Sequence, residues 1–189
     1  SITKEEESIC TYLIEWGAPI ATINPRHFIF KPCDAVRRFT KYDIMGSQAV
    51  MELYVQIATV FIWASFSYFT ARKIINLVDQ ADFQLNPRPL VSLFMAKTMF
   101  DLNTGKGHYN IEADEVFNTG IKAGEHWMTS ISAMNLGIQQ IAQGNYAHVI
   151  EISDRLKELG NSFENSFAIS QGYRIRSLCL MKFRKFEHL

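Results

Sequence analysis

The residues that could do chemistry are scattered along the chain and form no catalytic or metal-binding motif. The five histidines include no pair three or four residues apart, the spacing that places two zinc ligands on one helix face. Gly105-Lys106-Gly107 lacks both the earlier glycine and the Ser or Thr after the lysine that a phosphate-binding loop requires, so it predicts a turn. No Gly-x-Ser-x-Gly nucleophile elbow is present. The sequence therefore predicts no enzyme activity, no metal site and no cofactor.

Two pairs of acidic residues have the spacing of one helical turn. Glu112 with Glu115, and Glu151 with Asp154, could each place two carboxylates side by side, as a general acid and base require. Acidic residues at this spacing are far more common on a solvated helix face, where they take no part in catalysis. We interpret both pairs as surface residues.

The cysteines and the overall composition favour a cytoplasmic protein with a substantial core. Cys10, Cys33 and Cys179 are odd in number and far apart, so they form neither a disulfide framework nor a metal-ligand spacing. Hydrophobic residues make up 48% of the 189 positions, which argues against a disordered chain. The 19 basic and 19 acidic side chains cancel, so no overall field draws the protein to nucleic acid or to an anionic membrane.

The clearest structural signal is a helical hairpin over residues 131–160. Apolar residues recur every three or four positions on both sides of the Gly144-Asn145 break, which predicts two helices. A turn this short folds the two helices antiparallel. Such a hairpin cannot bury its own apolar surface and needs further hairpins stacked on it.

This stretch resembles the tetratricopeptide repeat. Leu136-Gly137 matches the Leu-Gly pair in the first helix of that repeat, and Gln143-Gly144-Asn145-Tyr146 matches its turn and the aromatic residue that opens its second helix. Val149 and Leu156 depart from the family pattern, which has small residues there. The resemblance implies an all-α fold of stacked antiparallel helical hairpins, as a right-handed solenoid or a helical bundle. The stretch is similar to the divergent repeats of large signalling proteins.

Two parts are expected along the chain. Residues 1–46 predict an N-terminal helix, capped by Thr3 and Glu6 and ending near Gly17, followed by a proline-punctuated segment. Residues 47–189 predict tetratricopeptide-like repeats, of which the last is truncated.

The repeats are expected at intervals of about forty residues. The unit over residues 131–160 carries the motif of the family, and the other units are inferred from spacing alone. A second helix is predicted to end at Gly160-Asn161 in that unit. The aromatic residues taken as equivalent after each turn are Tyr68, Tyr109, Tyr146 and Phe186. The helix of the Tyr109 unit is predicted to begin at Asn110 or Tyr109.

The apolar run from Ala49 to Phe69 is long enough to raise the question of a membrane span. Glu52, Gln56 and several hydroxyl groups weaken that interpretation, and no basic flank precedes the run. We expect instead a buried helix and a turn at Ser65-Phe66-Ser67. No membrane partner is therefore expected.

An uncharged polar stripe on the first arm of the hairpin is the predicted site of peptide contact. Ser132, Asn135, Gln139 and Gln143 fall three or four positions apart and so share one helix face. Their amides and hydroxyl can hydrogen-bond to an extended peptide backbone, although the stripe could equally face plain solvent.

The groove positions that the resemblance implies are apolar in this sequence. Either another helix covers them, or the ligand is hydrophobic. These positions are Ile131, Met134, Ile138 and Ile141.

The leading functional hypothesis is a non-catalytic module that binds a protein or a peptide, as the sensory or regulatory part of a larger signalling protein. The chain begins at Ser1 without an initiator methionine and stops at Leu189 within an apolar helical pattern. We therefore expect a fragment or a processed product. A homo-oligomer is compatible with the same sequence.

Basic and aromatic residues alternate in two clusters, a pattern found on surfaces that bind single-stranded nucleic acid. The second cluster lies between Tyr173 and Lys185. The simpler interpretation is that the aromatic residues fill the core and the cations are solvated, and the zero net charge favours it. A helical nucleic-acid-binding or nucleocapsid-like assembly protein is the alternative hypothesis. The basic residues of the first cluster that it would use are Arg26, Lys31, Arg37 and Arg38.

This alternative predicts that the chain shifts single-stranded RNA in a gel. The shift should weaken as salt is added, because binding would release counterions from the phosphates. Arg37→Ala combined with Arg38→Ala should abolish it. A shift that is insensitive to salt, or that the double variant retains, would contradict the alternative.

Overall fold

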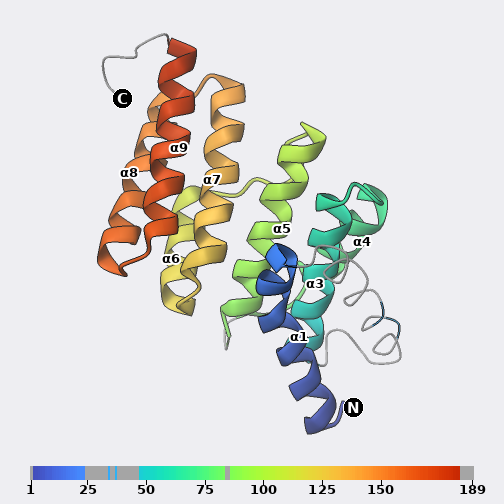
Figure 1. The fold of residues 1–189 in the computed structure, drawn as a ribbon. Helices are drawn as coiled ribbons and strands as arrows, with labels where there is room; N and C mark the ends of the chain where they lie inside the picture. Colours follow the sequence, from blue (N-terminus) through green and yellow to red (C-terminus); the bar gives the residue numbers. More distant parts are fainter. Residues whose placement is uncertain (1, 24–33, 35–36, 38–46, 84–85, 184–189) are drawn as a thin grey trace. The chain divides into compact units, whose positions relative to one another are not determined.

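The computed structural model describes residues 2–23, 34, 37, 47–83 and 86–183, with the backbone alone for residues 16–23 and 183. The part of the chain so described contains helices, turns and loops but no β-strand. The predicted all-α fold is therefore confirmed. The helices drawn in Figure 1 are α1 (Lys4–Ile23), α3 (Gln48–Trp63), α4 (Tyr68–Val78), α5 (Arg88–Thr104), α6 (Ala113–Ala123), α7 (His126–Gln143), α8 (Tyr146–Ser162) and α9 (Ser166–Phe183).

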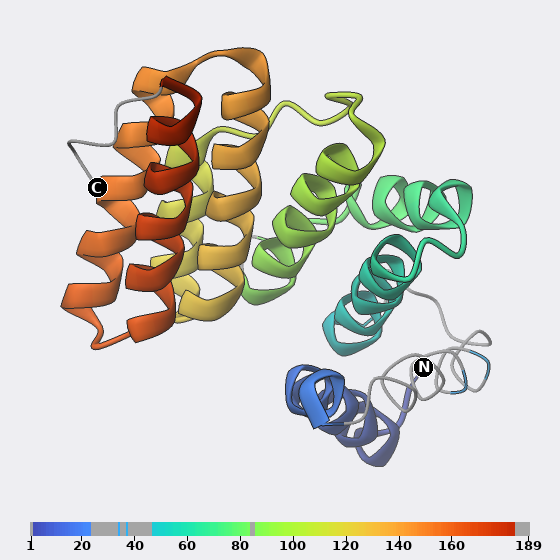
Figure 2. The ribbon, with the colours of Figure 1, turned by 45° about the horizontal axis from the view of Figure 1, so that its top comes forward.

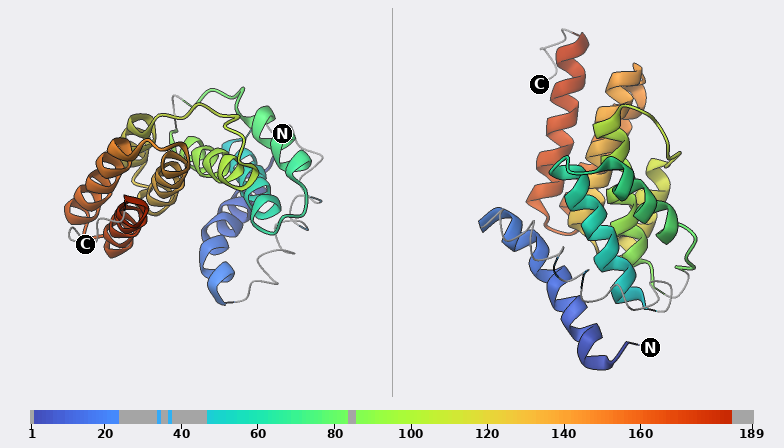
Figure 3. Two further views of the ribbon diagram at one scale, coloured as in Figure 1. Left: turned by 90° about the horizontal axis from the view of Figure 1, so that it is seen from above. Right: turned by 90° about the vertical axis from the view of Figure 1, so that its right-hand side faces the viewer.

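The chain divides into two compact units, Ser1–Phe100 and Asp101–Leu189. In the first unit α3 packs against both α1 and α4 (Figure 2). In the second unit α7 packs against α6, α8 and α9, and α8 lies along α9 (Figure 3). The pairs α3–α4, α6–α7, α7–α8 and α8–α9 are thus neighbours in the sequence that pack against one another, as expected for helical hairpins.

Helix α1 is capped as its sequence predicts, but it is longer. The Thr3 Oγ1 atom accepts a hydrogen bond from the Glu6 amide at 3.2 Å, and Glu6 Oε2 accepts one from the Thr3 amide at 3.0 Å. These two bonds form a complete capping box. Cys10 then packs on α3 in a shared core. The predicted end at Gly17 is wrong, because the helix continues through Pro19 to Ile23.

The turn predicted within the long apolar run is confirmed. Residues 64–67 separate α3 from α4. The Ser67 Oγ atom caps α4 by accepting a hydrogen bond from the Thr70 amide at 3.2 Å, and Ser65 adopts a left-handed φ of 54°. Among the residues that the structure describes, no helix combines the length and the hydrophobicity that crossing a bilayer requires.

Helices α7 and α8 form the hairpin predicted over residues 131–160. Gly144 follows α7 with a φ of 82°, a left-handed value that glycine adopts without steric cost. The Asn145 amide donates to the Gln140 carbonyl oxygen at 2.9 Å and so closes the end of the helix. The second helix, predicted to end at Gly160-Asn161, ends one residue later. α8 continues to Ser162, because a glycine within a helix costs only about 1 kcal/mol.

Small residues allow α8 and α9 to approach closely. The Ser153 Oγ atom donates to the Gly172 carbonyl oxygen at 3.0 Å. A Cβ atom added to Gly172 would lie 2.8 Å from the Ser153 carbonyl oxygen, and one added to Gly160 would lie 2.8 Å from the Asn165 carbonyl oxygen. Because backbone atoms in a packed interface have little room to move, both positions require glycine.

The predicted helix start at Asn110 or Tyr109 is wrong. The buried Asp101 carboxylate accepts hydrogen bonds from the His108 amide and from the Tyr109 amide, each at 2.9 Å. These bonds hold Tyr109 in a loop, and α6 begins only at Ala113. Tyr109 therefore does not open a helix, and the predicted interval of about forty residues fails at this position. Phe186 lies outside the described residues.

We expect Gly172→Ala to lower the free energy of unfolding by about 1–3 kcal/mol, although alanine is the better helix former. The added methyl group would press on the Ser153 backbone across the α8–α9 contact. Urea denaturation, monitored by far-ultraviolet circular dichroism, measures the change in the free energy of unfolding. Gly107→Ala is the matched control, because its Cβ would meet no atom within 4 Å. Equal effects of the two substitutions would contradict the close contact.

Candidate functional site

The predicted polar stripe on α7 runs from the core to the surface. Ser132 and Asn135 are buried, and Ser132 Oγ donates to the Met128 carbonyl oxygen at 2.9 Å. Gln139 is half-buried and Gln143 is exposed. The stripe therefore offers a peptide its C-terminal end, while its N-terminal end belongs to the core.

The first basic cluster lies largely beyond the part of the chain that the structure describes. Arg26, Lys31 and Arg38 lie outside the described residues. Arg37 is described, and its side chain is exposed. The structure thus places one of the four residues on which the nucleic-acid alternative depends.

The second basic cluster turns two of its cations toward side chains of its own unit. Arg176 Nη1 lies 3.0 Å from Asp154 Oδ1. Arg174 Nη1 lies 3.7 Å from Met134 Sδ, a contact between α9 and α7. These positions connect neighbouring helices, and Arg174 also borders the apolar face of α7.

The two described cysteines are buried free thiols. Burial, with smaller contributions from Glu7 and Glu6, raises the pKa of Cys10 to about 11. Burial also raises the pKa of Cys179, against the opposing charge of Arg176. Both side chains are therefore protonated at neutral pH, and a protonated thiol is a poor nucleophile and a poor metal ligand.

The acidic residues predicted at the surface lie there in part. Glu112, Glu115 and Glu151 are exposed, whereas Asp154 is half-buried and paired with Arg176. In the described part of the chain no group of three or more His, Cys, Asp or Glu side chains is placed to hold a metal ion. Neither acidic pair has the buried, partnered setting of a general acid and base.

A shallow hollow between the start of α6 and α8 is lined by charged residues. Its volume is about 30 Å³, enough for a few water molecules and too small for an organic substrate. Arg155 forms an ion pair with Asp114, and its guanidinium lies 4.3 Å from the centroid of the Phe117 ring. His148 Nδ1 lies 3.4 Å from Glu151 Oε2. Four of the side chains that line the hollow, Asp114, Arg155, His148 and Glu151, therefore pair with one another.

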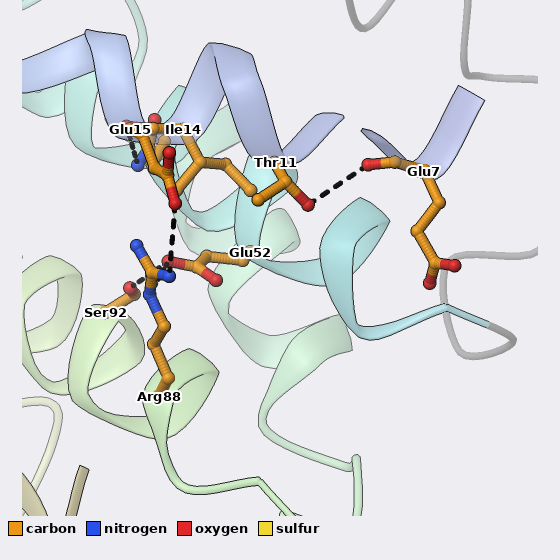
Figure 4. Close-up of polar contacts among 8 residues, drawn as sticks. Glu7, Thr11, Ile14, Glu15, Glu52, Arg88 and Ser92 are labelled. Carbon is orange, nitrogen blue, oxygen red and sulfur yellow. Dashed lines mark hydrogen bonds and ion pairs between the residues drawn. The ribbon is translucent and has the colours of Figure 1, made fainter. Parts of the chain in front are cut away.

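One carboxylate is buried in the first unit. Glu52 of α3 is 5% exposed, and its Oε1 atom accepts a hydrogen bond from Ser92 Oγ at 3.3 Å. Arg88 Nε lies 3.4 Å from the same oxygen. Figure 4 shows Arg88 of α5 between Glu52 and Glu15, whose Oε1 atom is 3.9 Å from Arg88 Nη1. Removing the partner of a buried charge costs several kcal/mol, so Arg88 stabilises the burial of Glu52.

Further polar contacts join α1 to α3 beside this network. Gln56 Nε2 donates to the Ile14 carbonyl oxygen at 3.2 Å, and Ser47 Oγ donates to Glu7 Oε1 at 3.3 Å. The Glu52 network therefore links α1, α3 and α5, and its charged side chains pair with one another. We assign it a structural role.

Four ring side chains gather at one end of the second unit. His126 and Trp127 open α7, Phe163 follows the end of α8, and Phe167 lies in the first turn of α9. The His126 and Phe163 rings stack with their centroids 4.0 Å apart, and the Trp127 and Phe167 rings have their centroids 6.2 Å apart. These four residues are called the aromatic corner.

The aromatic corner remains exposed although its rings pair. Trp127 is 43% exposed and Phe163 is 45% exposed. The Nδ1 atom of His126 is buried and has no hydrogen-bond partner among the described residues. Glu164, next to Phe163, adopts a left-handed φ of 52°, which costs a non-glycine residue on the order of 1 kcal/mol. Exposed aromatic area and local backbone strain together are typical of a binding site.

An incompletely covered apolar stripe runs along α7 from the aromatic corner. Helical periodicity places Trp127 on the same face as the groove positions that the resemblance implies, and on a different face from the polar stripe. All four groove positions are half-buried. With 18 residues, α7 is about 27 Å long, which an extended peptide of about eight residues would span. The residues of this apolar stripe are Ile131, Met134, Ile138 and Ile141.

The sequence did not single out the aromatic corner, because its residues come from two separate helix-to-helix turns. A signal was present, since aromatic residues flank both turns. Which rings meet depends on the packing of α7, α8 and α9, which periodicity does not give.

Comparisons with known proteins found no match to the chain, whether with protein-family models, with curated proteins or with solved structures. The aromatic corner and the apolar stripe are therefore interpreted from their own geometry.

We expect Arg88→Ala to lower the free energy of unfolding by about 3 kcal/mol, because the Glu52 carboxylate would stay buried without its counter-charge. Glu15→Gln should lower it by less than about 1 kcal/mol, since Glu15 is 59% exposed and lies at the edge of the network. Urea denaturation measures both. Small and equal losses would show that Glu52 does not depend on Arg88.

Proposed function

We propose that the chain is a non-catalytic helical module that binds a protein or a peptide along the apolar stripe of α7, anchored at the aromatic corner. The observation that carries this proposal is the exposure of Trp127 and Phe163 within a cluster of four rings. Aromatic side chains in such clusters contribute most of the energy at many interfaces. A partner that covers them would bury area that water now contacts.

The packing of the second unit supports a tetratricopeptide-like scaffold. Helix α7 contacts both its hairpin partner α8 and the following helix α9, as stacked hairpins do. Gly137, from the Leu-Gly pair of the motif, lies against α9: a Cβ atom there would be 2.9 Å from Ile175 Cδ1. The glycine thus allows the next helix to approach, which is the role that a repeat needs at this position.

The chemistry of the surface indicates what kind of peptide would bind. One ring of each pair is exposed, Phe163 beside His126 and Trp127 beside Phe167, so an aromatic, aliphatic or proline side chain of a peptide can stack on it. Arg174 borders the stripe through its contact with Met134 and can pair with a carboxylate of the ligand. At the far end of α7, Gln143 offers an exposed amide for the peptide backbone.

The proposed module fits the sensory or regulatory part of a larger signalling protein, as the resemblance to signalling-type repeats implies. A stripe for about eight extended residues suits recognition of a tail or loop of a partner domain. No step of this function needs a metal, a cofactor or a catalytic group.

The test is a selection of random peptides for binding to the intact chain, followed by affinity measurement with the best peptide. We expect enriched peptides to carry an aromatic or large aliphatic residue. Trp127→Ala should weaken binding by about 30-fold or more, the effect of losing an aromatic anchor. Fluorescence anisotropy of the labelled peptide measures the dissociation constant.

Phe69→Ala is the matched control, because Phe69 is an exposed aromatic residue of the first unit and lies outside the stripe and the corner. It should leave the affinity unchanged. Circular dichroism would verify that both variants remain helical. A selection that enriches no peptide, or a Trp127→Ala variant that binds as tightly as the unaltered chain, would overturn the proposed function.

A further inference from the structure

The first unit carries a separate exposed aromatic surface at the corner between α3 and α4. Trp63 at the end of α3 is 53% exposed, Phe66 in the turn is 57% exposed, and Phe69 at the start of α4 is 70% exposed. The Phe66 ring is held edge-on against the Phe61 ring, with the centroids 6.4 Å apart. More than half of the surface of each of these three residues is thus accessible to solvent.

Two cations accompany these aromatic residues. Arg72 and Lys73 of α4 are exposed, and Lys73 Nζ lies 4.4 Å from the centroid of the Phe69 ring. Phe69 and Lys73 are one helical turn apart on the face of α4 opposite its buried residues. The three exposed aromatic residues with Arg72 and Lys73 are called the α4 surface.

The positive charge of the α4 surface has no acidic counterpart nearby in the sequence. No Asp or Glu occurs between Glu52 and Asp79, a stretch that includes all of α4 and most of α3. Both of these acids are themselves engaged, Glu52 with Arg88 and Asp79 with Lys97. Local charge is therefore positive although the chain as a whole is neutral.

We propose that the α4 surface docks on an anionic membrane surface. Trp and Phe side chains are stabilised at the boundary between lipid headgroups and acyl chains, and Lys and Arg are attracted to anionic headgroups. The rings protrude at a helix corner, and protruding rings enter a deformable lipid surface without needing a complementary cavity. An acidic protein partner would have to supply such a cavity for each ring.

The geometry of α4 fits attachment to the surface of a bilayer. With 11 residues α4 is about 16 Å long, so it lies within one interface and cannot span the hydrocarbon core. Three rings and two cations give weak, reversible binding that salt weakens, because exposed charges are screened within about 10 Å. This inference is independent of peptide binding by the second unit, since the two surfaces share no residue.

The test is co-sedimentation of the intact chain with vesicles. We expect binding to vesicles of phosphatidylcholine and phosphatidylserine in equal parts, reduced by added salt, and little binding to phosphatidylcholine alone. Arg72→Gln with Lys73→Gln should weaken binding by roughly 30-fold, about fivefold for each cation. Phe66→Ser with Phe69→Ser should weaken it by at least about tenfold.

The aromatic corner of the second unit provides the matched control. Trp127→Ser with Phe163→Ser removes a comparable exposed aromatic area without touching the α4 surface, and it should leave vesicle binding within about twofold of the unaltered chain. In a variant with Trp16→Phe and Trp127→Phe, Trp63 is the one remaining tryptophan. Its fluorescence should shift to shorter wavelength when phosphatidylserine vesicles are added.

Several outcomes would overturn the membrane proposal. One is a chain that sediments with neither type of vesicle; another is a Phe66→Ser, Phe69→Ser variant that binds as well as the unaltered chain. Binding to soluble poly-glutamate without binding to vesicles would also overturn it and would assign the α4 surface to an acidic protein partner. Circular dichroism of each variant separates these outcomes from loss of folding.

Discussion

The close approach of α8 to α9 is the constraint on which the rest of the second unit depends. It exists because Gly160, Gly172 and Ser153 carry almost no side chain where the two helices meet. With α9 packed against α8, the Ile175 side chain of α9 also packs against Gly137 of α7. The same packing brings Phe163 and Phe167 of the α8–α9 turn beside the rings at the start of α7. The candidate site is therefore a consequence of where small residues stand.

Much of the helical architecture could be predicted from periodicity and from turn chemistry. The hairpin at Gly144-Asn145, the turn before Tyr68 and the capping box at Thr3 each follow from local features that the sequence displays. The wrong boundaries have a common cause. At Gly17 and at Gly160-Asn161 glycine was taken as a helix end, whereas α1 continues to Ile23 and α8 to Ser162, because one glycine within a helix costs only about 1 kcal/mol.

The loop at Tyr109 shows why a regular repeat could not be extrapolated from one good unit. An aromatic residue stands at about the right interval, but Asp101 captures the two amides that would otherwise have begun a helix. A buried carboxylate from the end of α5 decides the local conformation, and this interaction spans seven and eight residues. Spacing alone does not reveal such a contact, because it depends on where the preceding helix ends.

The functional surfaces escaped prediction for a different reason: exposure is a tertiary property. Ser132 and Asn135 were predicted to contact a peptide because they are polar, yet they are buried. Trp63 and Phe69 belong to an apolar run that was expected to form a buried helix, yet both are exposed. Averages mislead in the same way. The net charge is zero, yet the stretch between Glu52 and Asp79 has no acidic residue and carries two exposed cations. The apolar run over residues 49–69 raised the question of a membrane span, whereas the turn within it exposes aromatic rings to solvent. Where large aromatic side chains are exposed together, the physical expectation is a partner that covers them.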